Sequence, residues 1–155
     1  MRRDNPRGAA AQQKEHPMRY MMIVKGTAKS EAGVMPTEDQ FAEMGAYNEE
    51  LAKAGVLVDL AGLQATSKGA KIRFSGGKRT LIHGPFPDAT DIFAGYWIIN
   101  VKSPEEAVEW AMKAPNPSFG DADGEIELRR FFEMEDFEPS PALDKARELE
   151  FPGKR

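Results

Sequence analysis

The side chain best suited to acid–base chemistry is His83, in the stretch Leu-Ile-His-Gly-Pro-Phe-Pro-Asp at residues 81–88. Its imidazole titrates near neutral pH, so it could give or take a proton in a reaction. A carboxylate within hydrogen-bond reach would fix the tautomer, and Asp88, Asp91 and Asp59 could supply one. The alternative is a half-exposed histidine at the end of a strand with no chemical role. We therefore treat His83 as the candidate acid or base, and Asp88 or Asp59 as the residue that orients it.

Four further residues could bind a ligand rather than react with it. Asn48 falls on the inner stripe of a predicted helix, where a buried amide must be hydrogen-bonded, either to a loop or into a pocket. Tyr47 lies beside it with a phenolic hydroxyl. Phe86 either fills a hydrophobic slot or lines a cleft. Arg73 could hold an anionic ligand through two parallel hydrogen bonds, or it is simply an exposed arginine on a hairpin.

Composition excludes several other chemistries. The chain has 155 residues, which suits one domain, and it has no cysteine and a net charge of −4. Disulfides, a thiolate nucleophile and a cysteine-ligated metal are therefore excluded, and a reducing cytoplasm is compatible with the composition. Residues 1–17 form a polar, aperiodic segment that we expect to be a flexible arm, and it holds His16, one of only two histidines. We expect no metal, no cofactor, no direct contact with nucleic acid and no membrane span.

Two hydrophobic patterns, one typical of strands and one typical of helices, divide the rest of the chain. Short apolar or alternating runs predict six strands. They are residues 19–24, 56–60, 72–74, 80–82, 96–101 and 125–132. The two middle runs flank Gly76-Gly77, which supplies the positive φ angles of a tight hairpin turn. Gly95, just before the fifth run, indicates a bulge or a close approach of two backbones.

Capping residues mark the predicted helices. Thr37 with Gln40 has the spacing of a capping box, and Phe41, Met44 and Leu51 would form the inner face of that helix. The second helix begins with a Ser-Pro-Glu-Glu sequence at residues 103–106. A short third helix, capped by a serine, is expected within the C-terminal tail at residues 138–155.

The element order is β-α-β, hairpin, β-α-β. This is an α+β fold on the ferredoxin-like, split βαβ plan with an inserted β-hairpin, and both helices would cover one face of an antiparallel sheet. The other face carries too many apolar residues to remain in water, and a second copy of the chain is the simplest cover. The sequence therefore predicts a homodimer.

Several motifs, in the right order, resemble the DGPF-type branch of the YCII-related family across residues 18–137. The motifs are MRYMMIVKG, EELAKAGVLV, HGPFPDATDIFAGYWIINVKSPEEAVEWAMKAPN and EIELRRFFEMEDF. The resemblance implies a dimeric α+β barrel. The chain also departs from the family pattern, because His83 replaces the leading acid of the Asp-Gly-Pro-Phe motif. The His-Asp pair of a related branch is not carried over either, since its histidine would fall near Met44.

These observations lead to two functional hypotheses. The first is a small cytoplasmic homodimer with a cleft for a small organic molecule, and an enzyme if His83 acts as acid or base. The second is a non-catalytic binding or regulatory module accessory to transcription, because some proteins that this chain resembles are encoded near sigma factors or fused to them. A third possibility is a pocket filled by the chain's own Phe86 and Trp97.

Overall fold

The computed structural model describes residues 17–86, 91–119 and 122–149, and its centre is one four-stranded sheet. Neighbouring strands run antiparallel in the order β2-β5-β1-β6. Their bounds are β1 Met18–Lys25, β2 Leu57–Gly62, β5 Phe93–Val101 and β6 Ile126–Arg130. The predicted α+β class and antiparallel sheet are confirmed, and the strand order is compatible with the split βαβ plan. The predicted N-terminal arm, apart from Pro17, lies outside the described residues.

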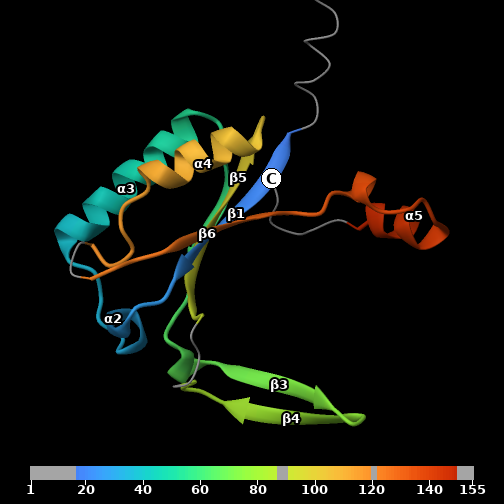
Figure 1. The fold of residues 1–155 in the computed structure, drawn as a ribbon, viewed down its shortest axis with the longest axis horizontal. Helices are drawn as coiled ribbons and strands as arrows, with labels where there is room; N and C mark the ends of the chain where they lie inside the picture. The colour runs from blue at the N-terminus through green and yellow to red at the C-terminus, as the bar shows by residue number, and fades with distance from the viewer. Residues whose placement is uncertain (1–16, 87–90, 120–121, 150–155) are drawn as a thin grey trace, which may run out of the picture.

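Two helices cover one face of this sheet (Figure 1). The described helices are α2 Ala28–Glu31, α3 Glu38–Lys53, α4 Pro104–Lys113 and α5 Pro141–Arg147, with 3-10 turns at Thr66–Lys68 and Met134–Asp136. The covering pair is α3 and α4, whereas α5 extends on the other side of the sheet. Within the described residues, no helix has the length and apolar character needed to cross a bilayer.

The predicted helix starts are confirmed by their hydrogen bonds. The Thr37 hydroxyl accepts from the Gln40 N–H at 3.3 Å, and the Gln40 side chain accepts from the Thr37 N–H at 2.9 Å. Ser103 and Ser140 cap α4 and α5 through their hydroxyls, each with a proline in the first helical turn. Such a cap stabilises a helix by about 1 kcal/mol, which explains why even the short α5 has a defined start.

The hydrophobic core lies between the two covering helices and the central strands. Met22, Leu51, Ile99 and Val101 are fully buried there. Because side chains alternate along a strand, the residues between them point to the other face. On that opposite face Met21 pairs with Ile98 and Ile23 with Tyr96 across β1 and β5. Ile23 is buried, whereas the other three are partly buried.

The predicted hairpin is present, but it projects away from the sheet. β3 (Ala70–Ser75) and β4 (Lys78–His83) form a separate two-stranded sheet. Gly76 and Gly77 make its turn with φ angles of 57° and 74°, as predicted. All residues of both strands are exposed, and Figure 1 shows the hairpin as an arm below the body.

The structure corrects two expectations about the first third of the chain. Phe41 was predicted on the inner face of α3, but its side chain is 56% exposed, and the buried residues of that helix are Tyr47 and Leu51. No helix was predicted from the sequence between the first strand and α3, where the structure has α2, which Thr27 and Ser30 cap reciprocally. Both differences concern the same corner of the molecule, where α2 meets the start of α3.

Gly95 lies where two backbones touch, which confirms the close approach predicted from sequence. A Cβ atom at Gly95 would lie 2.7 Å from the carbonyl oxygen of Ala61 on β2. Gly45, in the middle of α3, has no such neighbour within 4 Å. The same chemical change at the two glycines should therefore have opposite effects.

We predict that Gly95→Ala lowers the free energy of unfolding by about 1–3 kcal/mol, because β2 must shift away from β5. Gly45→Ala should raise it by about 0.5–1 kcal/mol, since alanine favours a helix interior. Urea unfolding followed by circular dichroism measures both. Equal effects of the two substitutions would contradict the close contact at Gly95.

Candidate functional site

His83 and Asp59, the two predicted catalytic residues that the structure describes, make no hydrogen bond with each other. His83 ends β4 opposite Ala70, and its imidazole is exposed without a hydrogen bond or ion pair to any described residue. Asp59, on β2, accepts a hydrogen bond from the N–H of Leu60 at 2.8 Å. Asp88 lies outside the described residues. The roles assigned to these residues from the sequence stay predictions.

Asn48 and Tyr47 have their polar groups engaged inside the core. The side-chain oxygen of Asn48 accepts from the indole N–H of Trp97 at 2.7 Å. The Tyr47 hydroxyl donates to the carbonyl of Trp110 at 2.7 Å, and its ring stands edge-on to Trp97 with centroids 5.3 Å apart. Burial, with a smaller contribution from nearby Glu50, raises the pKa of Tyr47, so this phenol stays protonated. Both residues join α3 to neighbouring elements.

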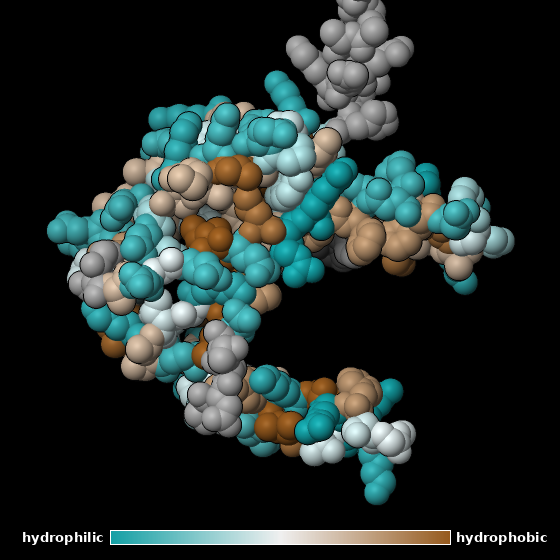
Figure 2. Space-filling model, viewed as in Figure 1, coloured by the Kyte–Doolittle hydropathy of each residue, from teal (hydrophilic) through white to brown (hydrophobic). Residues whose placement is uncertain are grey.

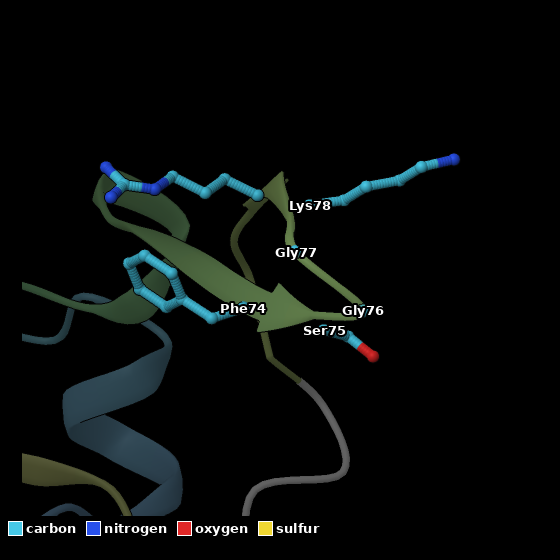
Figure 3. Close-up of a pocket in the computed structure, with 6 residues that line it drawn as sticks. Phe74, Ser75, Gly76, Gly77 and Lys78 are labelled. Carbon is cyan, nitrogen blue, oxygen red and sulfur yellow. The ribbon is translucent and has the colours of Figure 1, made fainter.

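Phe86 and Arg73 lie in different surroundings. The N–H of Phe86 donates to the hydroxyl of Thr66 at 3.1 Å, and the Lys71 ammonium lies 4.2 Å from the centroid of the Phe86 ring. Arg73 is exposed on β3, and its guanidinium makes no hydrogen bond or ion pair with the described residues. A shallow depression lies at the tip of the hairpin, beyond Arg73 (Figure 3). There the Phe74 ring lies along the strand, and the Lys78 side chain extends away from the hairpin.

A groove of about 1020 Å³ lies at the corner where α2 meets the start of α3. Its walls come from residues 27–37, the first turn of α3, the loop at 62–68 and the turn at 117–119. Apolar side chains dominate this lining. They include Val34, Met35, Phe41, Leu63, Ala65 and Phe119. The volume is at the upper end of the range of small-molecule pockets, and an apolar wall with few polar groups is typical of them.

The turn at the far wall of the groove has an unusual backbone. Phe119 has a φ angle of 54°, a left-handed conformation that is rare for a bulky side chain. The Asn116 carbonyl holds it by accepting from the Phe119 N–H at 2.7 Å. Ser118, which is buried, bonds to the Asn116 side chain at 2.8 Å and to the carbonyl of Ala122. Such local strain persists only where the surroundings enforce it.

Thr66 joins the groove wall to the Gly-Pro-Phe corner. Glu31 at the end of α2 accepts from the Thr66 hydroxyl at 2.6 Å and from its N–H at 3.0 Å. These bonds hold the pKa of Glu31 below its usual range, so this carboxylate stays ionised and acts only as an acceptor. The same threonine receives the N–H of Phe86. A Cβ at Gly84 would lie 1.7 Å from the Thr66 carbonyl oxygen, so the glycine of the motif is needed for packing.

Comparison with known proteins gives the same assignment as the motifs. A model of the YCII-related domain matches residues 18–135, which include the whole sheet, α3, α4 and the hairpin. The chain belongs to the YCII-related family. It is also 30% identical over 80 residues to an uncharacterized protein of Rhizobium meliloti (strain 1021). That alignment covers 50% of this chain and 64% of the relative.

Sequence reasoning missed the residues that build the groove of this YCII-related protein. Glu31 was not singled out, because it has no motif of its own and its partner Thr66 lies 35 positions away. The Thr-x-x-Ser cap of α2 was a usable signal for the first wall, since it marks a helix start. The turn at Asn116, Pro117 and Ser118 was not predicted as part of any site.

We predict that Thr66→Val returns the pKa of Glu31 toward its ordinary value of about 4.3. Both oxygens of Glu31 bond to Thr66, so loss of the hydroxyl removes the stronger of the two contacts. Because the folded-state pKa is depressed, the associated stability is present above about pH 4.3 and is lost as pH falls through the folded value. The stability difference between wild type and Thr66→Val should therefore shrink in acid.

Carboxyl chemical shifts recorded by NMR across pH 2–7 would give the Glu31 pKa directly, and urea unfolding at each pH would give the stability difference. Ser67→Ala, at the next exposed position of the same turn, is the matched control and should leave both measurements unchanged. An unaltered Glu31 titration in Thr66→Val would rule out the proposed cause of the shift.

Proposed function

We propose that this YCII-related protein binds a small organic molecule with an apolar body and one anionic end in the groove between α2, the start of α3 and the 62–68 loop. The observation that carries the proposal is the apolar lining of a groove of about 1020 Å³. Exposed Leu63 and Phe41 line it, and apolar side chains left in water gain about 25 cal/mol for each Å² that a ligand covers.

The charge of the ligand is inferred from the polar groups at the groove. Glu31 lines it, but both of its oxygens are already occupied by Thr66. Lys68 also lines it and is exposed, and its ammonium group has no hydrogen bond or ion pair with a described residue. An anionic group on the ligand would pair with this ammonium. An exposed pair of this kind contributes up to about 1 kcal/mol.

Catalysis by His83 is a further step that the proposal does not require. His83 is not among the residues that line the groove, and no described carboxylate orients its imidazole. We therefore assign the groove to binding, while the acid–base role of His83 with Asp88 or Asp59 stays a prediction from the sequence.

We also propose that the chain functions as a homodimer, with the ferredoxin-like sheets of two copies facing each other as in a dimeric α+β barrel. Two observations support this. The helices α3 and α4 cover only one face of the sheet, and the opposite face carries Met21, Tyr96 and Ile98, which are only partly buried.

Groove binding can be tested with 8-anilinonaphthalene-1-sulfonate, a fluorescent probe with an apolar body and one sulfonate. Leu63→Glu places a charge in the apolar wall and should weaken binding roughly tenfold, equivalent to about 1.4 kcal/mol. Val108→Glu is the matched control, because Val108 and Leu63 are both 51% exposed and Val108, on α4, is outside the groove. Equal weakening by both variants would show that the probe binds elsewhere.

The anionic preference can be tested separately. Lys68→Gln should weaken the sulfonate probe by about two- to fivefold and leave the neutral probe N-phenyl-1-naphthylamine unaffected. Fluorescence titration at low ionic strength measures both. A similar loss for the two probes would refute pairing with Lys68 and leave only the apolar part of the proposal.

A further inference from the structure

The hairpin β3–β4 is an amphipathic ribbon that packs on nothing within the described chain. Cross-strand pairing places Ile72 beside Leu81 and Phe74 beside Arg79 on one face. Ile72, Phe74 and Leu81 are each more than half exposed. An isolated two-stranded hairpin is at best marginally stable in water, and such ribbons normally pack against another element. This arm therefore needs a partner surface.

The charge of the hairpin defines the chemistry of that partner. Between residues 66 and 86 the chain has five lysines and arginines and no aspartate or glutamate. These cations are Lys68, Lys71, Arg73, Lys78 and Arg79. Two of them lie over aromatic rings of the arm, Lys71 over Phe86 and Arg79 over Phe74. The partner surface must therefore be acidic around an apolar centre.

The chain itself contains such a surface, just after β6. Residues 131–138 read Phe-Phe-Glu-Met-Glu-Asp-Phe-Glu, with four acids and no base. Phe132 is 74% exposed and stacks on Phe137, with ring centroids 5.2 Å apart. Glu135 and Glu138 are exposed beside them. We call residues 131–138 the acidic aromatic segment.

The two complementary surfaces do not meet within one chain. Figure 1 shows the hairpin and the acidic aromatic segment, which leads into α5, as two arms on the side of the sheet away from α3 and α4. In the space-filling view the arms are separated by a wide open gap (Figure 2). A two-fold axis through this gap would bring the hairpin of each copy to the acidic aromatic segment of the other, because in such a dimer residue i contacts j and j contacts i.

We propose that two copies of this chain clasp each other, with the hairpin of each packed on the acidic aromatic segment of its partner. Ile72, Phe74 and Leu81 cover Phe132 and Phe137 across the interface. Arg79, on the same face of the hairpin as Ile72, Phe74 and Leu81, pairs with the acids of the partner segment. The proposal rests on the homodimer proposed above and adds a specific contact between the hairpin of one copy and the acidic aromatic segment of the other.

Sedimentation velocity across a range of protein concentrations tests the clasp. The double variant Ile72→Glu/Leu81→Glu should raise the dimer Kd by at least about a hundredfold, because it places charge at the centre of an apolar contact. Met112→Glu, at an exposed position of α4, should leave the Kd unchanged. Near-ultraviolet circular dichroism of buried Trp97 checks that the body of each variant is folded.

The outcomes separate the clasp from the dimer itself. A wild-type monomer would overturn both proposals. A dimer that both variants leave intact would overturn the clasp and keep the face-to-face dimer. Charge reversal gives a second criterion: Arg79→Glu should weaken the dimer, and adding Glu135→Lys should restore it. Failure of this rescue would also overturn the clasp.

Cross-linking tests which segments meet, and the lack of cysteine in the chain gives it no background. Differently tagged Phe74→Cys and Phe137→Cys chains are mixed and treated with a short bis-maleimide. The clasp predicts a covalent pair that carries both tags, and none when either variant is treated alone. A cross-link in the Phe74→Cys chain alone, or none in the mixture, would contradict it.

Discussion

The placement of both covering helices depends on the indole of Trp97 at the centre of the sheet. A buried N–H must be hydrogen-bonded, and Asn48 on α3 supplies the acceptor at 2.7 Å. Tyr47, the preceding residue, stands edge-on to the same ring and donates its hydroxyl to the Trp110 carbonyl on α4. One strand residue thus sets the rotation of α3 about its axis and, through Tyr47, the distance to α4.

This constraint also creates the groove. With Tyr47, Asn48 and Leu51 fixed toward the core, the first turn of α3 faces α2 and the 62–68 loop instead. Phe41 is therefore exposed although it lies in phase with the inner stripe. The groove is the space between the first turn of α3, which lies outside the core, and α2, which is too short to fill that space.

Features set by residues a few positions apart could be predicted from the sequence. The caps at Thr37 and Ser103 and the Gly76-Gly77 turn were predicted because their chemistry is local. Periodicity placed Phe41 inside because it cannot tell where the sheet stops beneath a helix. The partner of Asn48 lies 49 positions away, so only the need for a hydrogen bond was predictable.

The same limit applies to the candidate chemistry. The sequence predicted that His83 ends a strand, and it does. Whether a carboxylate orients the imidazole depends on where distant segments come to lie. That the hairpin would project from the body was equally beyond local pattern, because alternating residues look alike on an arm and at the edge of a sheet.

Thr66 explains how an arm that packs on no other described part of its chain can still have a defined direction. Its hydroxyl meets both Glu31 and the N–H of Phe86, while its carbonyl touches Gly84 at the base of the hairpin. The N–H of Gly84 also donates to the Gly69 carbonyl at 2.9 Å, which closes the base from the other side. A ribbon held at its base loses less conformational freedom on docking than a flexible loop of the same length. More of its apolar and charged surface is then available as net binding free energy, which is why a hairpin arm suits recognition better than a long loop would.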